Sequence, residues 1–183
     1  GTNGTAAFCE NSPSEDLFTY LGGTPDTGGT WTPALASGSG LFNPAVDAPG
    51  VYTYTVLGTP PCENQTATVT VTVNPIPNAG TNGTVDLCTT STPVDLFTVL
   101  GGTPDTGGSW SPALASGTGL FNPAVDVAGV YTYTVTGIAP CPNQTATVTV
   151  ALNPLPIAGT NGTAAFCENS PSEDLFTYLG GTP

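Results

Sequence analysis

An internal repeat constrains this chain more than any other feature. The pentapeptide Gly1-Thr-Asn-Gly-Thr5 recurs at residues 80–84 and again at residues 159–163, which gives a period of 79. Aligning residues 1–79 with residues 80–158 needs no gap and leaves 22 mismatches, so 57 of 79 positions are identical. Residues 159–183 then repeat residues 1–25 without a change. A period of this length indicates that one structural unit is built again and again along the chain.

The period predicts the domain organisation. We name residues 1–79 copy 1, residues 80–158 copy 2 and residues 159–183 copy 3, which corresponds to the first third of a further repeat. The chain is therefore expected to be a segment of a longer protein, and copy 3 is expected to have the same fold as residues 1–25. The connections Asn74–Ala79 and Asn153–Ala158 each hold two alternating prolines, which favours a stiff, extended backbone. We therefore expect the copies to be arranged serially as a semi-rigid rod.

The differences between the copies are clustered. Eight of the ten positions 6–15 differ from positions 85–94, and only the Cys9/Cys88 and Ser12/Ser91 pairs are kept. By contrast, residues 21–29 and 100–108 are identical. The invariant part is predicted to be framework, and the variable segments 6–15 and 85–94 are predicted to lie on the surface.

The charge composition excludes several function classes. The chain has no Lys, Arg or His against 13 Asp and Glu, which gives a net charge of −13. No cation is available to neutralise phosphates or anionic lipid, so no nucleic-acid partner is expected. Without His or Lys, the usual catalytic triads and His-ligated metals are impossible, and we predict that the protein is not an enzyme. No apolar run reaches the length of roughly 18 residues that a membrane span requires, so no membrane insertion is expected.

Alternating polar and apolar residues predict β-strands. Residues 66–73 alternate Thr with Ala or Val, and residues 50–56 place Tyr52, Tyr54 and Val56 on one side. A turn-rich stretch, residues 58–64, joins the two runs and suits an antiparallel hairpin. Residues 6–9, 29–32 and 41–42 read as short strands, and residues 16–21 as a strand or one helical turn. Six or seven short strands in each full copy predict an all-β fold of tandem immunoglobulin-like antiparallel β-sandwiches.

Four aromatic residues are predicted to form the structural core: Trp31, Tyr52, Trp110 and Tyr131. Residues 47–52 resemble the entry to strand F of immunoglobulin-like sandwiches, and residues 126–131 repeat this segment. The resemblance implies that the Tyr hydroxyl closes a corner on the upstream backbone.

The repeats also resemble a known family. Residues 21–31 and 49–55 are similar to the Ig-like tandem repeats of giant cell-surface adhesins of Bacteroidota, such as the SprB-type gliding adhesins. This resemblance implies a long extracellular stalk on a bacterial cell surface, exported by a type IX system. It implies no catalytic residue.

The cysteines predict disulfides. They lie at positions 9, 62, 88, 141 and 167, so their spacing alternates between 53 and 26, and no CxxC pair or His suggests a metal site. Because a small sandwich needs its own covalent staple, we expect the intra-copy pairs Cys9–Cys62 and Cys88–Cys141, with the partner of Cys167 outside the segment. The alternative is pairing across copies, as Cys62–Cys88 and Cys141–Cys167.

Two further features suggest ligands. The Asp26-Thr-Gly-Gly29 segment and its repeat, residues 105–108, are predicted to be turns rather than protease motifs. No cofactor is expected; the alternative is a Ca²⁺ site built from Asp26, Asp47 or the Glu15-Asp16 pair, because Ca²⁺ prefers oxygen ligands. The aromatics Trp31, Tyr52 and Tyr54 could form a sugar-stacking platform, although core positions are expected for at least two of them.

Together these features predict a structural or adhesive repeat segment of a long extracellular surface protein or filament, acting as a disulfide-stapled stalk. The expected partners are neighbouring repeats of the same chain, lateral copies that pair through edge strands, and surface glycans. The alternative is a carbohydrate-binding repeat array of a surface adhesin.

Overall fold

The computed structural model describes residues 1–38, 40–117 and 119–181. Copies 1 and 2 each contain four strands and one short 3₁₀ helix. In copy 1 these are β1 (Gly4–Cys9), η1 (Leu17–Tyr20), β2 (Thr30–Thr32), β3 (Gly50–Val56) and β4 (Gln65–Asn74). In copy 2 they are β5 (Gly83–Cys88), η2 (Leu96–Val99), β6 (Ser109–Ser111), β7 (Gly129–Val135) and β8 (Gln144–Asn153). Copy 3 contains η3 (Leu175–Tyr178).

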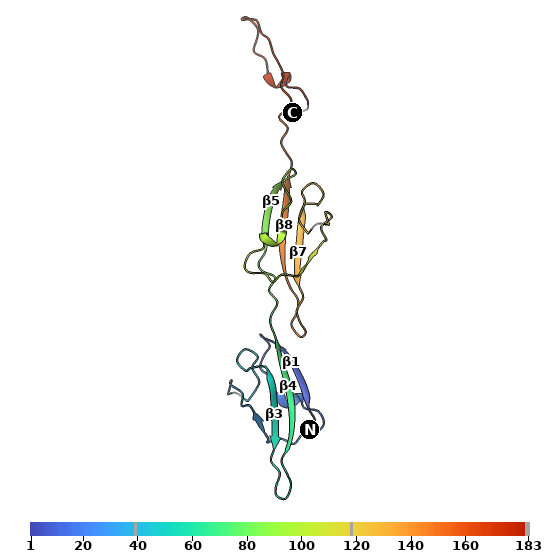
Figure 1. Ribbon diagram of the computed structural model, residues 1–183. Helices are drawn as coiled ribbons and strands as arrows, with labels where there is room; N and C mark the ends of the chain where they lie inside the picture. Colours follow the sequence, from blue (N-terminus) through green and yellow to red (C-terminus); the bar gives the residue numbers. More distant parts are fainter. Residues whose placement is uncertain (39, 118, 182–183) are drawn as a thin grey trace.

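Each full copy builds one four-stranded sheet, in the orders β1-β4-β3-β2 and β5-β8-β7-β6. The β2–β3 and β3–β4 ladders are antiparallel, but β1 pairs with β4 in parallel, from Gly4↔Val69 to Cys9↔Asn74. The expectation of a purely antiparallel fold is therefore wrong for this ladder. A hairpin forces neighbouring strands to be antiparallel, and no hairpin joins β1 to β4. Because the first and last strands run the same way, the chain enters a copy at one end and leaves it at the other (Figure 1).

The predicted alternation is confirmed in the central strands. Ala67, Val69 and Val71 of β4 are buried, whereas the threonines between them are partly or fully exposed. Tyr52 and Tyr54 of β3 lie on the same buried face. Copy 2 has the same pattern around Val148 and Val150, so each full copy has its own hydrophobic core.

In the part of the chain that the structure describes, irregular segments and not a second sheet cover this face. In copy 1, Leu17 of η1 and Phe42 are almost completely buried, with exposed fractions of 1% and 0%. The Asp16 carboxylate accepts a hydrogen bond from the Phe18 backbone N–H and caps η1. The expected strand at residues 41–42 is reduced to an isolated bridge between Glu15 and Phe42. Prolines and glycines are frequent in this layer, and a proline cannot donate a ladder hydrogen bond, so fewer strands form than the six or seven predicted.

The tyrosine corner is present in both full copies. The Tyr52 hydroxyl donates a 2.8 Å hydrogen bond to the Ala48 carbonyl, and Tyr131 donates a bond of the same length to Val127. This corner, the strand order and the buried sheet face define an all-β, immunoglobulin-like fold.

Copy 3 reproduces only the local part of residues 1–25. The 3₁₀ helix and the bridge between Thr160 and Gly180 match η1 and the Thr2–Gly22 bridge, but residues 162–167 form no strand. The expectation of an identical fold is therefore only partly met, because β1 needs β4 as its hydrogen-bonding partner. Phe166 is 50% exposed, whereas the equivalent Phe8 is 3% exposed. Residues 182–183 lie outside the described residues.

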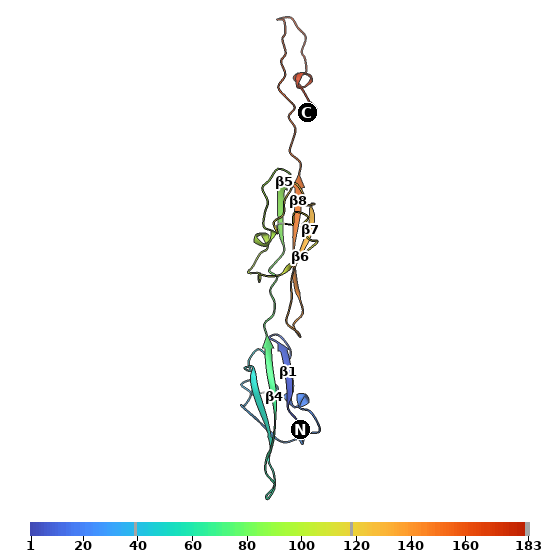
Figure 2. The same ribbon diagram turned by 45° about the vertical axis from the view of Figure 1, so that its right-hand side comes forward.

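The two sheets follow one another along the long axis of the molecule in both views (Figures 1 and 2). The β7–β8 hairpin of copy 2 extends toward copy 1, and the β3–β4 hairpin of copy 1 extends the same way beyond its own sheet. None of the helices in the described ranges has the length and apolarity that crossing a membrane requires.

Candidate functional site: the joint between copies 1 and 2

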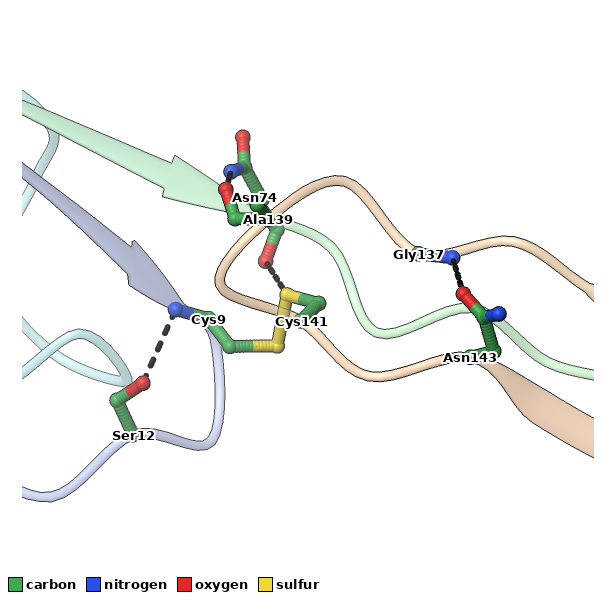
Figure 3. Close-up of a disulfide and its surroundings, with 7 residues drawn as sticks. All are labelled: Cys9, Ser12, Asn74, Gly137, Ala139, Cys141 and Asn143. Carbon is green, nitrogen blue, oxygen red and sulfur yellow. Dashed lines mark hydrogen bonds between the residues drawn. A yellow bond between two sulfur atoms is a disulfide. The ribbon is translucent and has the colours of Figure 1, made fainter.

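A disulfide links the two copies. Cys9, at the end of β1, is bonded to Cys141 in the β7–β8 loop, with a Cα–Cα distance of 5.1 Å and a sequence separation of 132 (Figure 3). Both cysteines are buried, with exposed fractions of 3% and 5%. The free cysteines are Cys62, Cys88 and Cys167.

The predicted intra-copy pairs Cys9–Cys62 and Cys88–Cys141 are therefore wrong, and so are the alternatives Cys62–Cys88 and Cys141–Cys167. Cys9 lies beside Asn74, at the last residue of β4, whereas Cys62 precedes the first residue of that strand. A strand of this length spans roughly 30 Å, and a disulfide needs Cα atoms within about 7 Å. The two cysteines of one copy lie at opposite ends of its sheet, and only a neighbouring copy can bring a loop cysteine to Cys9.

A tight turn holds Cys9 in place. Its backbone N–H donates to the Ser12 hydroxyl at 3.0 Å, and the Ser12 N–H donates back to the Cys9 carbonyl at 2.8 Å. The Glu10 N–H donates to the Asn74 carbonyl and so extends the β1–β4 pairing by one residue. This turn explains why Cys9 and Ser12 are kept in a segment where most positions change.

The β7–β8 loop presents Cys141 to this turn. The Cys141 N–H donates to the Ile138 carbonyl at 2.9 Å. The Gly137 N–H donates to the Asn143 side chain at 3.0 Å, as Figure 3 shows. The Asn74 amide group donates a 2.8 Å hydrogen bond to the Ala139 carbonyl, and the Cys141 sulfur lies 3.4 Å from the Asn74 carbonyl oxygen. The end of β4 and the loop of copy 2 are thus joined by polar contacts beside the disulfide.

The other end of the linker is fixed to copy 2 through Asn78. The Asn78 N–H donates to the Asp105 carboxylate at 2.8 Å, and the Asp105 N–H donates to the Asn78 carbonyl at 2.7 Å. The Asn78 side chain also donates to the Thr103 carbonyl and accepts from the Gly80 N–H. Pro77 and Ala79, on either side, are buried, and Ala79 belongs to the core of copy 2. The linker is therefore bound at both of its ends.

The variable segment 6–15 is not all surface, which corrects the expectation. Ala6 and Phe8 are 5% and 3% exposed and pack in the core of copy 1. In copy 2 the equivalent residues are Val85 and Leu87, which are partly buried against the second core. Alternate residues of β1 face the core, so apolar exchanges are tolerated there, whereas Ala7 between them and the turn that follows the strand are exposed.

Of the four predicted core aromatics, the two tyrosines are more deeply buried than the two tryptophans. Tyr52 and Tyr131 are buried, whereas Trp31 and Trp110 are half-buried and pack against Tyr54 and Tyr133. No aromatic side chain is exposed among the described residues of copies 1 and 2. Trp31, Tyr52 and Tyr54 therefore form no exposed platform on which a sugar ring could stack.

The Asp26 segment is a turn, as predicted. Gly28 has φ +86°, a conformation that favours glycine. The Tyr54 hydroxyl accepts from the Gly29 N–H at 2.7 Å and donates to the Asp26 carbonyl at 3.0 Å, which closes the turn over the sheet. The same bonds occur between Tyr133 and residues 105–108.

The buried carboxylate of Asp47 organises the loop before β3. It accepts backbone hydrogen bonds from Asn43 at 2.7 Å and Ser37 at 2.9 Å. Desolvation by burial acts to raise the pKa of Asp47, but these hydrogen bonds outweigh it and lower the pKa below its ordinary value of 3.8. Burial and the nearby Asp47 charge raise the pKa of Tyr52. Asp126 has the same environment in copy 2, with Ser116 and Asn122 as donors.

These bonds leave the Asp47 oxygens engaged with the backbone. Across the described ranges, no group of three or more Cys, Asp or Glu side chains is close enough to hold a metal ion. The Glu15 backbone pairs with Phe42, and the Asp16 carboxylate caps η1. The four carboxylates named for Ca²⁺ are thus not gathered in one site.

The sequence did not identify the joint. The alternating spacing of the cysteines is compatible with several pairings. The parallel β1–β4 register, which separates the two cysteines of one copy, has no signal in the sequence. Asn74, Asn78 and Asp105 are ordinary turn residues in sequence, and nothing in their pattern indicates a contact between copies.

Comparison with known proteins finds a likeness only among solved structures. No protein-family model matches the chain, and no curated protein matches it. Among solved structures, the chain is similar to hemolin, an insect immune protein whose domain arrangement is described as having implications for homophilic adhesion. The identity is 15% and the TM-score 0.36, over 84% of this chain and 45% of the hemolin chain. The chain thus spans under half of hemolin.

Proposed function

We propose that this chain is a structural segment of a long extracellular surface protein or filament, in which Ig-like copies follow one another as a semi-rigid stalk. The observation that carries the proposal is the joint between copies 1 and 2. A disulfide, the Asn78–Asp105 hydrogen bond of the linker, and the contact of Asn74 with the β7–β8 loop connect one copy to the next. Such a joint resists bending, which a single peptide linker would not do.

Two further observations support this function. Parallel first and last strands put the entry and exit of each copy at opposite ends, so successive copies extend along one direction. A disulfide is typical of oxidising, extracellular environments. The resemblance to Bacteroidota surface adhesins is the basis for proposing a bacterial cell surface. The buried position of Tyr52 and Tyr54 gives no support to the carbohydrate-binding alternative.

Small-angle X-ray scattering of the oxidised chain tests the stalk. We expect a maximum dimension that fits two copies end to end with a fixed angle between them. The Cys9→Ser variant should show a broader distribution of interdomain angles, because the disulfide is lost. Cys88→Ser is the matched control, since Cys88 is the equivalent residue in copy 2 and is free. A freely jointed oxidised chain, or equal scattering of all three proteins, would contradict the proposal.

A further inference from the structure

The joint between copies 1 and 2 has two parts: a turn with Cys9 at the exit end of copy 1, and a loop with Cys141 at the entry end of copy 2. The exit end of copy 2 and the entry end of copy 1 contain the same two parts, without a partner copy in the described residues. At the exit end of copy 2, Cys88 lies in the same turn as Cys9, with the Cys88 N–H bonded to the Ser91 hydroxyl at 3.0 Å and the Ser91 N–H bonded to the Cys88 carbonyl. The Thr89 N–H donates to the Asn153 carbonyl, as Glu10 does to Asn74. The exit end of copy 2 is therefore built like the half of the joint that receives Cys141.

At the entry end of copy 1, the Cys62 loop has the conformation of the Cys141 loop. The Cys62 N–H donates to the Thr59 carbonyl at 2.9 Å, and the Gly58 N–H donates to the Asn64 side chain at 3.0 Å. These bonds have the same partners and lengths, one period earlier, as those that present Cys141. Cys62 is exposed, however, whereas Cys141 is 5% exposed in its disulfide.

A cavity lies beside the Cys62 loop. It has a volume of about 340 Å³, and its lining includes Gly1, Thr24, Asp26, Val56 and Cys62. One period later these positions are Gly80, Thr103, Asp105, Val135 and Cys141. In copy 2, Thr103 and Asp105 hold the linker through Asn78, and Cys141 is bonded to the preceding copy. The cavity of copy 1 thus corresponds to the place where copy 2 holds its incoming linker.

The apolar residues of the second linker are correspondingly exposed. Leu155 and Ile157 are 57% and 70% exposed, and Pro156 and Ala158 are exposed where Pro77 and Ala79 are buried. Ile157 replaces Asn78, so a joint made by this linker would keep the backbone bonds to the aspartate and lose the side-chain bonds. The exit end of copy 2 therefore has an exposed apolar segment, and the entry end of copy 1 has a cavity, with both polar and apolar lining residues, at the positions where copy 2 holds its linker.

We propose that the entry end of copy 1 is a docking site for the exit end of a further copy of this repeat. Its linker would lie in the cavity beside Asp26, and its counterpart of Cys88 would form a disulfide with Cys62. This inference rests on the stalk function proposed above and specifies its connections: every joint is closed by a strand-end cysteine and the loop cysteine of the following copy. The same surface never binds itself, so the contact is heterologous and forms open, linear arrays.

The covalent step balances with an external disulfide oxidant. The thiols of Cys62 and of the Cys88 counterpart lose two protons and two electrons and form one S–S bond. Oxidised glutathione accepts the electrons and protons and leaves as two thiols. Hydrogen bonds from the Thr90 side chain and backbone beside the Cys88 sulfur lower the pKa of this half-buried thiol and so favour the reactive thiolate.

The test adds one copy in front of Gly1. A chain in which residues 80–158 precede the full sequence provides copy 1 with an exit end. After refolding in a glutathione buffer, digestion with pepsin at low pH and mass spectrometry would identify the disulfides; trypsin is unsuitable because the chain has no Lys or Arg. We expect Cys62 to be paired with the added copy of Cys88 and to be protected from alkylation. The added copy of Cys141 should remain free, as Cys62 is in the present chain.

Asp26→Ala in the extended chain tests the cavity. In a buffer whose ratio of oxidised to reduced glutathione only partly oxidises Cys62, this variant should increase the alkylation rate of Cys62 several-fold. Asp86→Ala, a change at an exposed position of β5, should not. The Cys9–Cys141 bond in the same molecule reports correct folding. If that bond forms while Cys62 stays free, or while the two added cysteines pair with each other, the inference is overturned. Small-angle scattering of the same sample distinguishes the docking inference from the proposed stalk function. A long rod with free Cys62 would contradict the docking inference but agree with the stalk function. A compact or freely jointed chain would contradict both.

Discussion

Among single residues, Asp47 and Asp126 are the charged side chains that the fold buries within the described part of the chain. Each accepts backbone N–H groups that have left water, in a chain that has no cationic side chain to pair with an acid. Their charge is thus stabilised by hydrogen bonds alone, which is why the pKa is lowered although the side chain is buried.

Replacing Asp47 by Asn should destabilise copy 1. The amide presents one acceptor oxygen in place of two, so one of the Ser37 and Asn43 N–H groups is left without its partner. The expected loss is about 1–3 kcal/mol in the free energy of unfolding, measured by urea denaturation. Asp86→Asn, at an exposed position, is the control. A loss no larger than that of the control would contradict the role of Asp47.

The same two carboxylates make the stability of the fold depend on pH in the acidic range. Because folding lowers the pKa of Asp47 and Asp126, their contribution is fully present above the ordinary value of 3.8 and is lost as the pH falls through the lowered value. Between pH 6 and pH 2, the melting temperature of the native chain should therefore fall relative to that of the Asp47→Asn, Asp126→Asn double variant, because the relief of general carboxylate repulsion is nearly the same in both. A difference that does not change with pH would refute this assignment.

At the scale of elements, the linker works because both of its ends are bound. Asn74 lies at the end of β4 and contacts the β7–β8 loop, and Asn78 is held by the turn that contains Asp105. The same turn occurs in copy 1 around Asp26, where no linker is bound within the described residues. The repeat therefore provides a matched pair of positions for mutagenesis.

Asp105→Ala should loosen the linker, and Asp26→Ala should not. The first removes the carboxylate that accepts from the Asn78 N–H, for an expected cost of about 1 kcal/mol at this exposed position. Hydrogen exchange of the Asn78 amide should become about five-fold faster at that cost. Equal exchange in both variants would show that the carboxylate does not hold the linker.

At the scale of the whole molecule, the one disulfide of the described residues links copy 1 to copy 2 and lies within neither copy. Each full copy has its own hydrophobic core, and neither core contains both cysteines of its copy. Reduction should therefore affect the geometry of the chain more than the folding of its parts.

Reduction with a phosphine reductant should shift the main thermal transition by less than the roughly 4–8 °C that 1 kcal/mol produces in a domain of this size. Over the same conditions, scattering should show increased bending between the copies. Calorimetry with and without reductant makes the comparison, and Cys9→Ser should reproduce the reduced state. A large fall in melting temperature would indicate that the disulfide stabilises the copies themselves.

The uniform charge predicts a salt dependence. With a net charge of −13 and no cation, the carboxylates repel one another at long range. Raising the ionic strength from about 0.01 M to 0.15 M shortens the screening length from about 30 Å to about 8 Å. The melting temperature should rise accordingly, and a fall would mean that attractive charge interactions dominate.

The repeat, the strands β3 and β4, the tyrosine corner and the turn at Asp26 could all be predicted from the amino-acid sequence. Each of these depends on neighbouring residues: alternation defines a strand with one buried face, and glycine and proline define a turn. The parallel β1–β4 ladder, the irregular layer that covers the sheet, and the partner of Cys9 could not be predicted in this way and are known from the folded chain. Those features depend on contacts between residues that are far apart in the sequence. For example, the length of β4 separates Cys9 from Cys62, and Cys9 lies at the end of the sheet that the Cys141 loop of the next copy contacts. Copy 3 shows the same division, since its sequence forms the local turns of residues 1–25 but no strand without a β4 to pair with.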